Sequence, residues 1–190
     1  MYFGVNEIRI DRKVSELDRF VLDFISIVQN FSKYVIINGY VAILLGRTRA
    51  TEDVDIFISQ MNKDKLKELY DTLLNKGYWC VNSDNFDELY EYLSSGIGIR
   101  FSQKGEIVPN MEVKFAIKTL QKEALLDTIK IKIYGEELII SSLERQIAFK
   151  RYYLKSDKDL EDARHIEKIL GEKVNKEKIA YYKKKIENDA

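Results

Sequence analysis

Hydrophobic and polar residues follow two periods along this 190-residue chain, and the periods separate expected helices from expected strands. From residue 14 to residue 31, apolar side chains recur every three or four positions, which predicts an amphipathic helix. The apolar positions of this segment are Leu17, Phe20, Val21, Phe24, Ile25 and Val28. A second helix with this spacing is expected to end at Lys76, before Gly77, with Asn62 or Ser59 as its N-cap.

Short β-branched and aromatic runs between the helical segments predict the strands of a largely buried sheet. The expected strands cover residues 34–37, 54–59, 78–81, 97–103, 111–116, 128–134 and 136–140. The last two strands flank Gly135 as a β-hairpin. Residues 40–45 and 120–126 are expected to form short helices, whereas the acidic stretch 85–95 is compatible with a helix or a loop.

The pattern becomes helical from Ser141 to the end of the chain. Ser141 and Glu144 have the spacing of a capping box at the start of the first of these helices. Ser156 and Asp159 give a related signal for the start of the next helix.

The order of these elements predicts an α/β (α+β) fold in which helices flank a mixed β-sheet. The sheet and its helices are expected to form a core over residues 1–140. A C-terminal helical subdomain, a bundle of three helices, is expected over residues 141–190.

Composition limits the chemistry that the protein has available. The one cysteine, Cys80, excludes a disulfide within the chain, and its aromatic neighbours are typical of a small core residue. The one histidine, His165, excludes a zinc site built on two histidines and leaves a single candidate base for a Ser-His-Asp triad. Any catalysis must therefore rest on carboxylates and lysines.

Charge and hydrophobicity restrict the partners. The formal net charge is zero, so no overall field draws the chain onto nucleic acid. The basic run Lys183–Lys185 is interpreted as the exposed face of a terminal helix, because acidic residues lie beside it. No apolar run approaches the ~20 residues that cross a bilayer, and the first residues lack a secretory signal. We therefore expect a cytoplasmic protein with no membrane partner.

Candidate chemistry is concentrated in residues 35–58. A buried strand runs through Gly39 directly into a short helix, whose first backbone N–H groups are available to phosphate. The following strand carries Asp53 and Asp55, which share one face roughly 6–7 Å apart because side chains alternate along a strand. Two such carboxylates repel each other, and Mg²⁺ with phosphate partners would compensate them. The alternative is an ordinary solvated strand face.

Asn38-Gly39 followed by Asp53-Val54-Asp55 resembles the signature of the DNA polymerase β-like nucleotidyltransferase superfamily. The resemblance implies a triphosphate bound at the glycine turn and two divalent metal ions, here Mg²⁺, bound at the acids. It also implies transfer of a nucleoside monophosphate from an NTP to an acceptor. Asn38 departs from the pattern, since the family has Gly or Ser there, although its side chain can still donate to a phosphate.

The resemblance also implies a third acid on a neighbouring strand, and Glu112 is the residue that matches it. Glu112 would act as a metal ligand or as general base for the acceptor hydroxyl. The alternative is a surface residue paired with Lys114, which shares its strand face.

Residues 133–150 and 158–162 are similar to one branch of that superfamily, the prokaryotic minimal nucleotidyltransferases related to abortive-infection toxins of toxin–antitoxin systems. The resemblance implies that Lys150 contacts the nucleotide phosphates and that Asp159 and Asp162 support the site. Lys150 as a solvated helix residue, and Asp159 as a charge favoured at a helix N-terminus, are the structural alternatives.

Arg47 and Arg49 precede the acids, and both residues are suited to phosphate contact. We include Arg49 with Asn38 and Gly39 in the expected nucleotide site. The alternative is that the two arginines fix their loop to Glu52.

Three functions fit these residues. The leading hypothesis is a magnesium-dependent nucleotidyltransferase that modifies an RNA or protein acceptor as part of a toxin–antitoxin pair, with an antitoxin as a further partner. The second keeps the chemistry but takes an aminoglycoside or lincosamide antibiotic as acceptor. The third is a degenerate nucleotide-binding module without catalysis.

Overall fold

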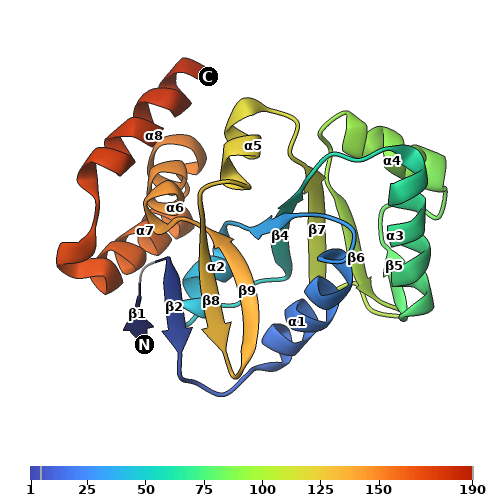
Figure 1. Ribbon diagram of the computed structural model, residues 1–190, viewed down its shortest axis with the longest axis horizontal. Coiled ribbons are helices and arrows are strands. Elements are labelled where there is room, and N and C mark those ends of the chain that lie inside the picture. The colour runs from blue at the N-terminus through green and yellow to red at the C-terminus, as the bar shows by residue number, and fades with distance from the viewer. Residues whose placement is uncertain (5, 190) are drawn as a thin grey trace.

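A computed structural model describes residues 1–4 and 6–189 and confirms a mixed α/β fold (Figure 1). The strands are β1 (Tyr2–Phe3), β2 (Glu7–Ile10), β3 (Tyr34–Ile36), β4 (Asp53–Ile58), β5 (Tyr78–Cys80), β6 (Ile99–Gln103), β7 (Asn110–Phe115), β8 (Thr128–Ile133) and β9 (Glu136–Ser141). They form one sheet in the order β1-β2-β8-β9-β3-β4-β7-β6-β5. The central strands β4 and β7 are parallel, and β3 pairs with β4 antiparallel.

The helices are α1 (Glu16–Val28), α2 (Gly39–Leu44), α3 (Lys63–Asn75), α4 (Phe86–Ser94), α5 (Thr119–Ala124), α6 (Leu143–Phe149), α7 (Asp157–Leu170) and α8 (Lys176–Asp189). In Figure 1, α6, α7 and α8 lie at the left and α3 and α4 at the right, while α1 and α5 lie between these two groups. A π-helical segment, η1 (Lys150–Leu154), continues α6, and a 3₁₀ turn, η2 (Gly171–Lys173), follows α7. The acidic stretch 85–95, whose sequence is compatible with a helix or a loop, contains the helix α4.

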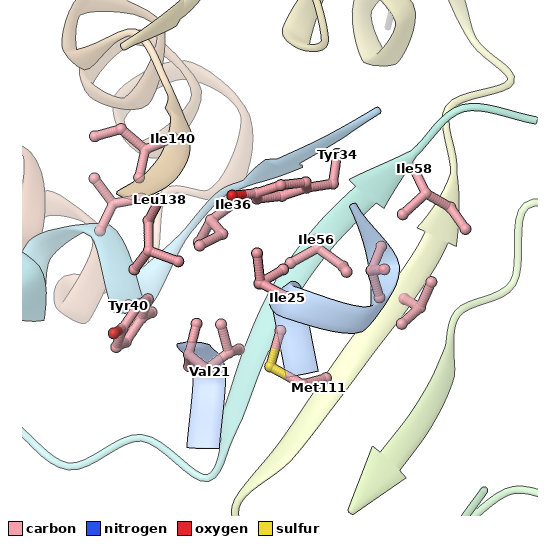
Figure 2. Packing of buried hydrophobic residues seen from close by; sticks show 14 of the residues in the cluster. Val21, Ile25, Tyr34, Ile36, Tyr40, Ile56, Ile58, Met111, Leu138 and Ile140 are labelled. Carbon is pink, nitrogen blue, oxygen red and sulfur yellow. The ribbon is translucent and has the colours of Figure 1, made fainter. Parts of the chain in front are cut away.

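The two faces of β4 differ, as its alternating sequence predicts. Val54, Ile56 and Ile58 are fully buried, and the intervening side chains are partly exposed on the opposite face. Figure 2 shows Val21 and Ile25 of α1 packed near Ile56, so the predicted apolar face of α1 packs against the buried face of β4. The acidic face of β4 is therefore held in place by a core on its other side.

Of the two helix starts predicted in the C-terminal half, one needs correction and the other is confirmed. The predicted capping box at Ser141 and Glu144 is wrong, because Ser141 is the last residue of β9 and its hydroxyl accepts a hydrogen bond from Gln146 Nε2 at 2.5 Å. The N-cap of α6 is Ser142, and its hydroxyl donates to Asp127 rather than capping the helix. The predicted cap of α7 is confirmed, since the Ser156 hydroxyl accepts from the Asp159 N–H.

The N-terminal segment, for which no element was predicted, also joins the sheet. β2 pairs in parallel with β8, and β1 adds to its outer edge. Among the described residues, no helix combines the length and apolar character that crossing a bilayer requires.

A buried carboxylate connects α1 to the short helix α2. Asp18 is fully buried and accepts hydrogen bonds from Arg12 Nη2 at 2.9 Å, from the Ser15 N–H at 2.8 Å and from the Tyr40 hydroxyl at 2.8 Å. Burial alone would raise the pKa of Asp18, but these donors outweigh it and lower the pKa to about 2. The ionised carboxylate is thus the form that stabilises the fold.

Replacing Asp18 by Asn is expected to lower the free energy of unfolding by about 1.5–3 kcal/mol at neutral pH, because hydrogen bonds to a charged group are lost. A lowered folded-state pKa gives stability that is present above the ordinary carboxyl pKa of about 3.9 and lost as the pH falls toward the folded value. The difference between wild type and Asp18→Asn in urea unfolding should therefore shrink from pH 7 to about pH 2.5. Asp23→Asn, on an exposed position of the same helix, is the control. An equal difference at both pH values would contradict this role of Asp18.

Candidate functional site

The two predicted acids lie together on the open face of β4. Asp53 accepts a hydrogen bond from the Thr51 hydroxyl at 3.2 Å, and the Asp55 side chain is only 15% exposed. Burial raises the pKa of Asp55, and the negative charges of Glu112 and Asp53 add to the increase, while Lys114 and a hydrogen bond from the Asn38 side chain oppose it. The positive charge near Asp55 therefore does not offset the effect of burial on its carboxylate.

The predicted glycine turn lies next to these acids. Asn38 has a positive φ of 62°, and its backbone N–H donates to Gln146 Oε1 of α6 at 3.2 Å. A Cβ atom built at Gly39 would lie 1.9 Å from Arg49 Nη2. The Arg49 guanidinium thus covers the start of α2, and a side chain at position 39 would displace it.

Arg49 is held in this position by a buried carboxylate of α7. Asp162 is fully buried and accepts from Arg49 Nη2 at 3.3 Å, from Lys150 Nζ at 2.8 Å and from Arg47. Arg47 also pairs with Glu161. The suggestion that the two arginines fix their loop to Glu52 is therefore wrong, since both pair with α7.

Lys150 is not a solvated helix lysine. It is 1% exposed, at the start of η1, and its ammonium lies between Asp162 and Asp159, the latter at 3.3 Å. Its predicted contact with nucleotide phosphates stays a prediction. In this structure Lys150 is connected to Arg49 through the shared partner Asp162.

Glu112 lies beside Asp55 because the parallel register of β4 and β7 places the two residues opposite each other. One of its carboxylate oxygens accepts from Lys114 Nζ and the other from Arg100 Nη2 at 3.0 Å. Burial raises the pKa of Glu112, but the contacts with Lys114 and Arg100 outweigh burial and lower it. The pairing with Lys114 considered from the sequence is thus present, with Arg100 as a second partner.

The three acids do not form one cluster of ligands. Within residues 1–4 and 6–189, no group of three or more His, Cys, Asp or Glu side chains is arranged to hold a metal ion. Asp53 and Asp55 nevertheless suit a divalent cation, because they share a face and the charge of Asp55 is poorly compensated. Glu112 is already occupied by two cations.

A cleft of about 440 Å³ opens beside the acids, between the sheet and the helices that follow it. The sheet side of the cleft includes Asn38, Phe57 and Lys114, and the helical side includes Arg145, Gln146, Phe149 and Tyr153. None of the three acids lines the cleft, but Asn38 and Lys114 do, and both residues interact with Asp55.

Arg145 is the buried cation of this cleft. It is 4% exposed and lies over the rings of Phe149 and Tyr182, at 4.4 and 4.9 Å from their centroids. It donates to the Leu120 carbonyl and pairs with no carboxylate in the described part of the chain. Burial lowers the pKa of Arg145. Through these ring contacts Arg145 links α6 to α8, and its guanidinium places a positive charge in the wall of the cleft.

Several residues of the site were not predicted. The sequence does carry a signal for Asp18, since Ser15 stands three residues before it as in a capping box. It also carries one for Gly98, which lies close to Glu112, because a glycine inside a strand pattern often marks a close approach. No local signal points to Arg145 or Gln146.

Asp162 is expected to determine the stability of this region. Asp162→Ala should lower the free energy of unfolding by about 3–5 kcal/mol, because it leaves buried cations without their shared partner. Lys168→Met, an exposed change on the same helix, should stay within about 0.5 kcal/mol of wild type. Urea unfolding monitored by circular dichroism measures both, and similar midpoints for the two variants would contradict the role of Asp162.

Comparisons with known proteins identify the fold. None of the known protein-family models and none of the curated proteins matches the chain. Among solved structures, an antigenic nucleotidyltransferase-like protein from Paracoccidioides brasiliensis is similar with a TM-score of 0.53 and 19% identity, over 80% of this chain and 73% of that one.

Two antibiotic-related proteins are similar to the same extent. The antibiotic-resistance factor ANT(2'')-Ia has a TM-score of 0.54 and 15% identity, over 90% of this chain and 94% of its own. The lincosamide antibiotic adenylyltransferase LnuA, solved with lincomycin, has a TM-score of 0.53 and 13% identity, over 83% of this chain and 99% of its own. The chain therefore has a nucleotidyltransferase-like fold.

Proposed function

We propose that this protein is a magnesium-dependent nucleotidyltransferase that transfers a nucleoside monophosphate from an NTP to an acceptor. The observation that carries the proposal is the pair Asp53 and Asp55 on one face of β4, beside the Asn38-Gly39 turn. The nucleotidyltransferase-like fold of the chain supports it.

Asp53 and Asp55 are the residues proposed to hold Mg²⁺, which when bound polarises phosphoryl oxygens and offsets the charge that develops during transfer. Arg49 is proposed to balance phosphate charge, since its guanidinium lies at the start of α2 and its buried Nε lacks a partner among the described residues. Asn38 contributes through its side chain, because its backbone N–H already bonds Gln146.

The cleft beside the acids is proposed to hold the nucleoside. It combines aromatic side chains, Phe149 and Tyr153, with the buried cation Arg145. Flat heterocyclic rings stack on aromatic side chains, and such stacking is worth about 1–3 kcal/mol per base.

Three acceptor classes follow from the sequence and the comparisons. An RNA or a protein is the acceptor in the toxin–antitoxin hypothesis, in which an antitoxin would be a further partner. An antibiotic is the acceptor in the second hypothesis, which gains support because two of the similar structures are named for antibiotic resistance or antibiotic adenylylation. We place RNA or protein first and test all three together.

Nucleotide transfer is expected to depend on the acids of β4. The purified protein is incubated with each α-³²P-labelled NTP, Mg²⁺, and in turn total RNA, a protein lysate, or an aminoglycoside and a lincosamide. Asp53→Asn with Asp55→Asn should reduce label transfer by about a thousandfold or more, which corresponds to roughly 4 kcal/mol of lost transition-state stabilisation.

Asp64→Asn with Asp71→Asn is the matched control, because it removes two exposed carboxylates from α3. Equal transfer by wild type and the Asp53/Asp55 variant would refute the proposal. Nucleotide binding without metal dependence and without transfer to any acceptor would favour the non-catalytic module instead.

A further inference from the structure

The place between Asp55 and Glu112 is already taken by a side-chain cation. Lys114 Nζ lies 3.7 Å from Asp55 Oδ1 and is in direct contact with Glu112 Oε1. A metal ion that bridged these two carboxylates would have to lie where the ammonium lies. Mg²⁺ binds oxygens at about 2.0–2.1 Å and tolerates little distortion of its octahedral geometry, so it and the ammonium are alternatives.

The sheet register builds this arrangement. Asp55 is opposite Glu112 across the parallel pair β4–β7, and Arg100 is opposite Glu112 across the antiparallel pair β6–β7. Lys114 follows Glu112 by two residues on the same strand, so its side chain leaves the same face. Glu112 consequently has a cation on each side, and each of its carboxylate oxygens already has a cationic partner.

Gly98 provides the space for the pair. A Cβ atom at this position would lie 2.7 Å from Glu112 Oε1 and 2.8 Å from Lys114 Cε. Its φ lies outside the left-handed region, so the glycine is needed here for space and not for backbone conformation. The chain thus accommodates the Lys114–Glu112 pair by having no side chain at position 98, just before β6.

We propose that the Lys114 ammonium takes the place of a second metal ion, so that this protein binds a single divalent ion, on Asp53 and Asp55, with each triphosphate. The inference rests on the proposed function and specifies its cofactor requirement. Glu112 is then a positioning residue, which holds the positive charge of Lys114 beside Asp55.

Counting bound Mn²⁺ tests the proposal without measuring transfer. Equilibrium dialysis with one equivalent of inorganic tripolyphosphate per chain should give one Mn²⁺ per wild-type chain. A two-ion site, in which the ions lie about 3.5–4 Å apart, would give a count of two. Lys114→Met removes the cation from Glu112 Oε1 and should raise the count to two, with an electron paramagnetic resonance spectrum typical of spin-coupled Mn²⁺.

Lys130→Met is the matched control, because it also removes a strand lysine paired with a glutamate, Glu137 at 2.9 Å, but on β8, away from the acids of β4. Its count should remain one. Two ions on the wild-type chain, or one ion on the Lys114→Met chain, would overturn the proposal. The wild-type count decides the matter even if Lys114→Met fails to fold.

The outcomes separate this inference from the proposed function. A wild-type chain that transfers nucleotide and holds two ions refutes only the role of Lys114. A chain whose transfer survives the Asp53/Asp55 double substitution and which holds no Mn²⁺ refutes both.

Discussion

The arrangement of this site depends on the burial of one carboxylate, Asp162. A desolvated charge is tolerated in a protein only where opposite charges and hydrogen bonds surround it. Asp162 satisfies this requirement with Lys150 from the segment before α7 and with Arg47 and Arg49 from the loop before β4. The loop before β4 is thereby fixed to η1 and α7, from which it lies far apart in sequence, and Arg49 is placed over the start of α2.

A second buried carboxylate, Asp18, also helps to fix the position of α2. Asp18 fastens α2 to the start of α1 through the hydroxyl of Tyr40, the residue that follows Gly39. The glycine turn thus lies between two carboxylates that have their own cations, Arg12 in one case and Arg49 in the other. The acids of β4 differ from both, because Asp55 has no comparable partner of its own within the described residues. This contrast separates the structural carboxylates from those available to a ligand.

The sequence predicts those parts of the fold that depend on neighbouring residues in the chain. The alternation of β4 places Asp53 and Asp55 on one face, and the structure confirms that Val54 and Ile56 point into the core. The predicted N-cap of α7 at Ser156 also depends only on neighbouring residues, and the structure confirms it. These features follow from the geometry of a strand or a helix turn alone.

The remaining features could not be predicted from the sequence, because they depend on the register of the sheet and the packing of the helices. The pairing of Glu112 with Arg100 is set by the alignment of β6 with β7, which no spacing in the sequence reveals. The burial of Lys150 could not be predicted either, since a lysine on a helix usually faces solvent. The strands β1 and β2 are too short to show a clear period, and they join the sheet because β2 pairs with β8.

The contact between Gly39 and Arg49 constrains how this sequence can change. A side chain at position 39 would collide with the guanidinium of Arg49, and a shorter residue at position 49 would leave Asp162 with fewer cations. Neither position can therefore diverge freely by itself. In related proteins we expect the two positions to covary, with larger residues at 39 accompanied by smaller ones at 49 and a compensating change near Asp162.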